Sequence, residues 1–112
     1  MLQEKMQLAS RFLFLSMAIQ TLELDRQHIE YGNIKIKEPY IEKIEEMTSK
    51  AIKERHELRS AMYKDRIKIH LLHREGSFTT YQYILGKNEM EIPFNNMVIR
   101  KNVENILREL WQ

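Results

Sequence analysis

A heptad-like seam of apolar residues between positions 7 and 29 constrains the fold of this chain more than any other feature. The seam residues alternate steps of four and three: Leu8, Phe12, Leu15, Ile19, Leu22, Arg26 and Ile29. On a helix, this spacing places all seven side chains along one side. The seam therefore predicts one long helix from about Gln3 to Tyr31. Gly32 and Asn33 follow it, and we expect them to close its C-terminus in left-handed conformations.

The predicted helix is longer than a compact chain of this size is wide. About 28 helical residues span about 42 Å, whereas a compact domain of 112 residues has a diameter of about 34 Å. Either the helix breaks, or part of it projects and must be buried against something else. The segment from Phe12 to Ile19 is also apolar nearly all round, which indicates cover on two sides. We therefore expect a homodimer that forms through this helix. The predicted interface residues are Phe12, Leu15, Ile19 and Leu22.

A second helix is expected from Pro39 to about Lys64, because proline and acidic residues favour a helix start. The short connector predicts an antiparallel helical hairpin over residues 1–64. After Lys64 the hydrophobic period changes to two, which is typical of strands. Turns expected at Glu75-Gly76 and at residues 86–88 then give a three-stranded antiparallel meander. Pro93 indicates that the third strand lies at an edge of the sheet.

The last part of the chain returns to a helical period. Its apolar residues are Ile99, Val103, Ile106 and Leu110, at steps of four, three and four. We expect this C-terminal helix to cover one face of the small sheet. The element order is ααβββα, which is an α+β fold. Residues 1–112 form one domain, in which the hairpin is followed by the sheet and C-terminal helix of residues 65–112.

Composition and motifs exclude some functions and leave others open. The chain has no cysteine, which excludes disulfides and thiolate chemistry and fits a reducing cytoplasm. Its longest apolar run, residues 12–19, is far shorter than the roughly 20 residues that cross a bilayer, so no membrane contact is expected. His70 and His73 lie three apart, which puts them on opposite faces of a strand and argues against a metal site. We expect no cofactor and no enzyme activity, because no catalytic or phosphate-binding motif is present.

The favoured hypothesis is a small cytoplasmic binding or regulatory protein that acts through protein–protein contacts. The identity of its protein partner is unknown. Its seven methionines suit both core filling and adaptable contact surfaces. No motif in the sequence identifies a family.

The alternative hypothesis is nucleic-acid binding, because residues 50–74 carry a net charge of about +5 while the segments on either side are slightly acidic. If Glu75-Gly76 forms the hairpin loop, Lys68 lies opposite Tyr83 and His70 opposite Tyr81, so they share a face. The candidate contacts are Lys68, His70, Arg74, Tyr81 and Tyr83. Basic and aromatic side chains on an open sheet are typical of modules that stack single-stranded bases. A one-residue change in register would instead bury both tyrosines.

Overall fold

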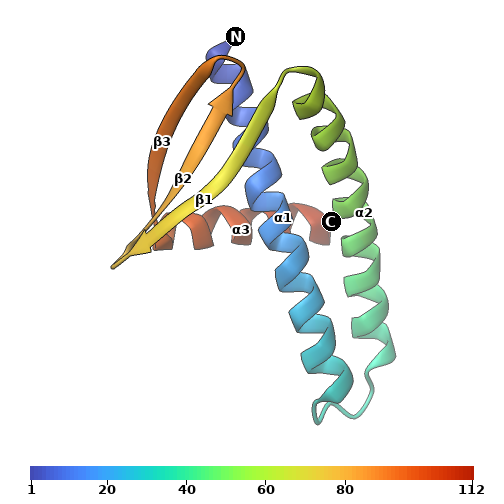
Figure 1. Cartoon of the computed structure of the whole chain (residues 1–112). Coiled ribbons are helices and arrows are strands. Elements are labelled where there is room, and N and C mark those ends of the chain that lie inside the picture. Colours follow the sequence, from blue (N-terminus) through green and yellow to red (C-terminus); the bar gives the residue numbers. More distant parts are fainter.

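The computed structural model describes all 112 residues and has the predicted ααβββα order (Figure 1). The elements are α1 (Leu2–Tyr31), α2 (Glu38–Lys64), β1 (Ile67–Glu75), β2 (Phe78–Leu85), β3 (Asn88–Asn95) and α3 (Asn96–Trp111). The α+β fold class is therefore confirmed.

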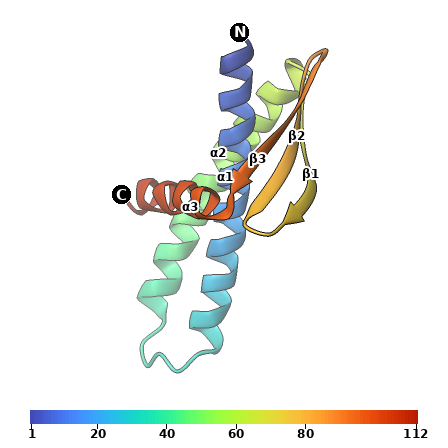
Figure 2. The same ribbon diagram turned by 90° about the vertical axis from the view of Figure 1, so that its left-hand side faces the viewer.

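The helices α1 and α2 form the expected antiparallel hairpin, and α1 is continuous over its 30 residues. A helix of that length is about 45 Å long, so the hairpin sets the 52 Å long axis of the molecule. Figures 1 and 2 show that the connector end of the hairpin extends well beyond α3 and the sheet. Neither the sheet nor α3 therefore reaches the connector end of the hairpin.

Gly32 ends α1, but the expected left-handed closure is wrong. Its φ is −90° and its ψ is −170°, which is extended backbone, and Asn33 has no positive φ. A Cβ atom at Gly32 would lie 2.5 Å from the carbonyl oxygen of His28. Glycine suits this position because the chain passes close against the last turn of α1.

The three strands form an antiparallel sheet in the order β1-β2-β3, so β1 and β3 are edge strands. Pro93 lies in β3, as expected for an edge. The inner face of the sheet is buried against the start of α1 and the end of α2. That buried cluster consists of Ala9, Met62, Ile67, Tyr81, Tyr83 and Leu85. Within it, the hydroxyl groups of Ser10 and Tyr83 share a hydrogen bond of 2.6 Å.

Helix α3 crosses the hairpin near its middle instead of covering the sheet, so that expectation was wrong (Figures 1 and 2). Its Ile106 and Leu110 are buried with residues of both hairpin helices. The cluster consists of Phe14, Leu15, Ala18, Leu22, Ile44, Met47, Ala51, Ile106 and Leu110. Because α1 already covers the inner face of the sheet, the apolar stripe of α3 is buried against the hairpin.

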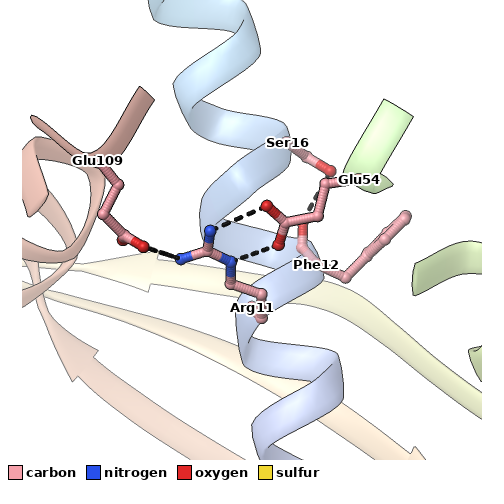
Figure 3. A network of polar contacts seen from close by, with 5 residues as sticks. All are labelled: Arg11, Phe12, Ser16, Glu54 and Glu109. Atoms are coloured by element: carbon pink, nitrogen blue, oxygen red, sulfur yellow. Dashed lines mark hydrogen bonds and ion pairs between the residues drawn. The ribbon is translucent and has the colours of Figure 1, made fainter. Parts of the chain in front are cut away.

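Arg11 connects the three helices (Figure 3). Its Nε and one terminal nitrogen donate to the two carboxylate oxygens of Glu54 in α2, at 2.6 and 3.0 Å. Its other terminal nitrogen donates to Glu109 in α3 at 3.0 Å. The hydrogen bonds from Arg11 hold the pKa of Glu54 below its ordinary value of 4.5. The network therefore fixes where α3 crosses the hairpin.

We predict that Arg11→Met destabilises the fold by about 1 kcal/mol, because a bidentate but partly exposed ion pair is lost while the aliphatic packing is kept. For a domain of this size, that loss corresponds to a fall in Tm of about 4–8 °C. Thermal unfolding followed by circular dichroism measures it.

The Glu54→Gln variant tests the pH dependence. The lowered pKa of Glu54 stabilises the folded state above pH 4.5, and this stabilisation is lost as the pH falls through the lowered pKa. The variant should therefore be less stable than wild type at about pH 7 and approach it at about pH 3. An equal difference in Tm at both pH values would contradict the role of this ion pair.

We also predict that Tyr83→Phe costs about 1–2 kcal/mol, because Ser10 then lacks the partner of its hydroxyl group in a largely buried setting. Tyr81→Phe is the matched control, since Tyr81 is buried on the same strand face but makes no side-chain hydrogen bond. Urea unfolding should give a clearly larger loss for Tyr83→Phe. Equal losses would show that the Ser10 contact contributes nothing.

Candidate functional site

An apolar groove lies where α3 crosses the hairpin, and we call it the hairpin–α3 groove. It has a volume of about 890 Å³. Its apolar lining comes from all three helices and consists of Leu22, Ile29, Ile44, Met47, Leu107 and Trp111. Trp111 is 61% exposed, and the Nζ atom of Lys43 lies 5.2 Å from the centre of its ring. The groove therefore presents a large aromatic side chain to solvent.

The polar lining of this groove carries both signs of charge. Its charged and titratable residues are Asp25, His28, Glu104 and Arg108. Arg108 donates two hydrogen bonds to Glu104, at 2.9 and 3.2 Å. These bonds and the nearby Lys101 hold the pKa of Glu104 below its ordinary value. Glu104 is thus kept ionised, which suits ion pairing rather than proton transfer near neutral pH.

A second groove, the α2–β1 groove, lies at the other end of the hairpin and has a volume of about 860 Å³. Its titratable side chains include four cations and one histidine: Arg59, Lys64, Arg66, Lys68 and His70. No carboxylate lines it. The apolar part of its lining is made by Phe12, Met62, Ile67, Ile69 and Ile84. Tyr63, which is 87% exposed, also lies there.

The predicted nucleic-acid platform on the sheet does not form, because the strand register differs from the expected one. The loop between β1 and β2 is Gly76-Ser77 rather than Glu75-Gly76, since Glu75 pairs with Phe78. Tyr81 and Tyr83 lie opposite Leu71 and Ile69. Both tyrosines are buried, so they share no face with Lys68 and His70.

A β-bulge at Leu72 causes this difference. The one-residue displacement of the loop would by itself leave His70 opposite Tyr83. Leu72 has no partner on β2, and the pairing shifts by one residue between Leu71 and His73. The bulge thus turns both tyrosines to the inner face. The Gly76-Ser77 loop places Arg74 opposite Thr79, on the face that carries Tyr81, and the bulge separates Arg74 from the face of Lys68 and His70.

Two of the predicted dimer-interface residues are buried within the chain. Leu15 and Leu22 belong to the core between the three helices, so a second copy cannot reach Leu15 without opening the fold. Phe12 is half-buried, and the guanidinium of Arg55 lies 4.7 Å from the centre of its ring. Ile19 is half-buried beside Ile52 in a shallow hollow. The predicted set therefore forms no single exposed surface.

Sequence reasoning missed two residues that the structure makes prominent. Tyr63 lies off the apolar stripe of α2 and inside the basic zone, which was an available signal for an exposed aromatic. Arg66 has a φ of +57°, a left-handed conformation that is uncommon for a residue other than glycine. No pattern in the sequence predicted that conformation.

The structure has neither a metal-binding cluster nor a membrane-spanning helix. No group of three or more histidine, aspartate and glutamate side chains is arranged to hold a metal ion. No helix has the length and hydropathy that spanning a membrane requires.

Comparison with known proteins places the chain in a family. A family profile described as "YhjD protein" matches residues 1–112. The "Uncharacterized protein YhjD" of Bacillus subtilis (strain 168) is 35% identical over 107 residues, which cover 95% of this chain and 89% of that relative. No solved structure matches. The chain belongs to the YhjD family.

Proposed function

We propose that this chain is a non-enzymatic binding or regulatory protein of the cytoplasm that acts through protein–protein contacts. Its first partner is a second copy of itself, bound at the hairpin–α3 groove. The observation that carries this proposal is the open apolar groove itself, at which Trp111 is 61% exposed. Ile29 and Leu107 are half-buried there, and the remaining apolar lining residues are buried.

The lining has the composition of a contact surface. Apolar surface that stays open to water beside a polar rim is typical of interaction sites, and tryptophan is enriched among the residues that contribute most to binding. Leu24 is also exposed on the same half of α1. Covering these side chains removes apolar area from water, at about 25 cal/mol per Å².

The charges around the groove favour a second copy as the partner. In a twofold dimer, each surface patch meets its own copy, so the patch must be complementary to itself. The lining carries the acidic Asp25 and Glu104 together with the basic Arg108 and the titratable His28. Glu104 and Arg108 pair with each other within one chain, so Asp25 is the acid of the groove that is left to pair with a base of the second copy. Helix α1 remains at the centre of the proposed interface, but through residues 22–29.

The proposal also assigns the groove to binding rather than to catalysis. Hydrogen bonds from Arg108 hold the pKa of Glu104 below its ordinary value and keep this carboxylate ionised. A general acid at neutral pH would need the opposite shift. An ion pair at the edge of an apolar groove instead serves to orient a partner.

We predict a dimer in solution at micromolar concentration. Light scattering should return twice the chain mass of 13.6 kDa. Trp111 is the only tryptophan, so its fluorescence should shift to shorter wavelength as the protein is concentrated and the ring leaves water. A mass of 13.6 kDa over this concentration range would overturn the proposal.

Single substitutions in α3 test whether the dimer forms at the hairpin–α3 groove or at another part of this helix. Trp111→Asp should give a folded monomer, because Trp111 is largely exposed within one chain and an unpaired charge in an apolar contact is unfavourable. Val98→Asp is the matched control, since Val98 is exposed on the same helix but does not line the groove. This control should remain dimeric. Dimerisation by both variants would place the interface elsewhere.

A further inference from the structure

The four cations of the α2–β1 groove are free of ion pairs. None of Arg59, Lys64, Arg66 and Lys68 takes part in a salt bridge. In the first half of α2, by contrast, Lys43 and Lys50 both pair with Glu46. The carboxylates nearest in sequence, Glu57 and Asp65, do not line the groove. The groove therefore concentrates uncompensated positive charge, which attracts an anionic ligand.

Tyr63 adds an aromatic surface to these cations. It is among the most exposed side chains of the molecule, and it lines the groove and the adjoining hollow that contains His56, Arg59 and Lys64. A ligand that carries only phosphate groups could bind through the cations alone. An exposed ring among cations additionally suits a ligand that alternates phosphates with flat bases.

Arg66 occupies a position at which the backbone itself favours glycine. Its φ of +57° turns the chain from the end of α2 into β1, and side chains larger than hydrogen are disfavoured in that region. Its carbonyl oxygen accepts a hydrogen bond of 3.0 Å from the backbone nitrogen of Gly86. The turn is thus held by the backbone, while the arginine side chain is not needed for it.

We propose that the α2–β1 groove binds single-stranded nucleic acid. Arg59, Lys64, Arg66 and Lys68 contact successive phosphates, and Tyr63 stacks on an unpaired base. A duplex keeps its bases stacked on one another, so it offers phosphates but no partner for Tyr63. This groove shares no lining residue with the hairpin–α3 groove. The proposal therefore stands independently of dimerisation.

Fluorescence anisotropy with labelled oligo(U), oligo(dT) and a duplex of equal length tests the proposal on the full chain. Single strands should bind more tightly than the duplex, and the two single strands show whether RNA or DNA is preferred. Four neutralised phosphates give a log–log salt slope of about −3, measured between about 50 and 200 mM salt. No binding at the lower salt concentration, or tighter binding of the duplex, would overturn the proposal.

Variants of Tyr63 test the stacking contact. Tyr63→Ala should weaken binding about 5- to 150-fold, the loss expected for one stacked base, and leave the salt slope unchanged. Tyr63→Phe keeps the ring and should keep the affinity. Tyr31→Ala is the matched control, because Tyr31 is 82% exposed at the opposite end of the hairpin. Equal affinities of the Tyr63→Ala and Tyr31→Ala variants would overturn the assignment.

The Arg66→Gly variant tests the contribution of the Arg66 side chain to binding without destabilising the fold. Glycine adopts the left-handed conformation freely, so thermal stability should not fall, while the salt slope should become shallower by about 0.7. Lys68→Ala should reduce the slope by the same amount.

Anionic lipid vesicles are the competing polyanion. Release of the oligonucleotide by vesicles, together with an unchanged affinity in Tyr63→Ala, would indicate a membrane surface instead and overturn the proposal.

Discussion

The burial of α1 on several sides by its own chain is the constraint on which the rest of the structure depends. The helix α2 runs along it, the sheet covers its start, and α3 crosses its middle (Figure 1). Ala9 and Ala18 of α1 and Ala51 of α2 are fully buried in these contacts. Their small side chains allow the other elements to approach closely. The apolar segment that suggested a dimer is therefore covered within a single chain.

The crossing of α3 determines which surfaces remain open. Arg11 joins Glu54 and Glu109, so the position of α3 is set by charge as well as by the burial of Ile106 and Leu110. A helix that crosses the hairpin covers only its middle. The apolar residues on the connector side then form the hairpin–α3 groove, and the α2–β1 groove remains open at the opposite end of the hairpin.

A single unpaired residue, Leu72, determines which side chains of β1 and β2 share a face of the sheet. Alternation along β1 correctly separates Ile67 and Ile69 from Lys68 and His70, because successive side chains of a strand point to opposite faces. The tyrosines of β2 can be assigned to a face only through the pairing of the two strands. The bulge changes that pairing, and no local pattern in the sequence indicates it. Because Tyr81 and Tyr83 are buried, the exposed aromatic side chain beside the cations of the α2–β1 groove is Tyr63 of α2.

The sequence by itself determined the elements of this protein: a long first helix, the helical hairpin, the meander with Pro93 at an edge, and the C-terminal helix. These follow from hydrophobic period, proline and turn residues, which act over a few neighbouring positions. Only the tertiary structure decided that α3 covers the hairpin, that Tyr81 and Tyr83 are buried, and which cations stay unpaired. Periodicity shows which side of an element is apolar. Which neighbour covers that side depends on contacts between residues distant in the chain.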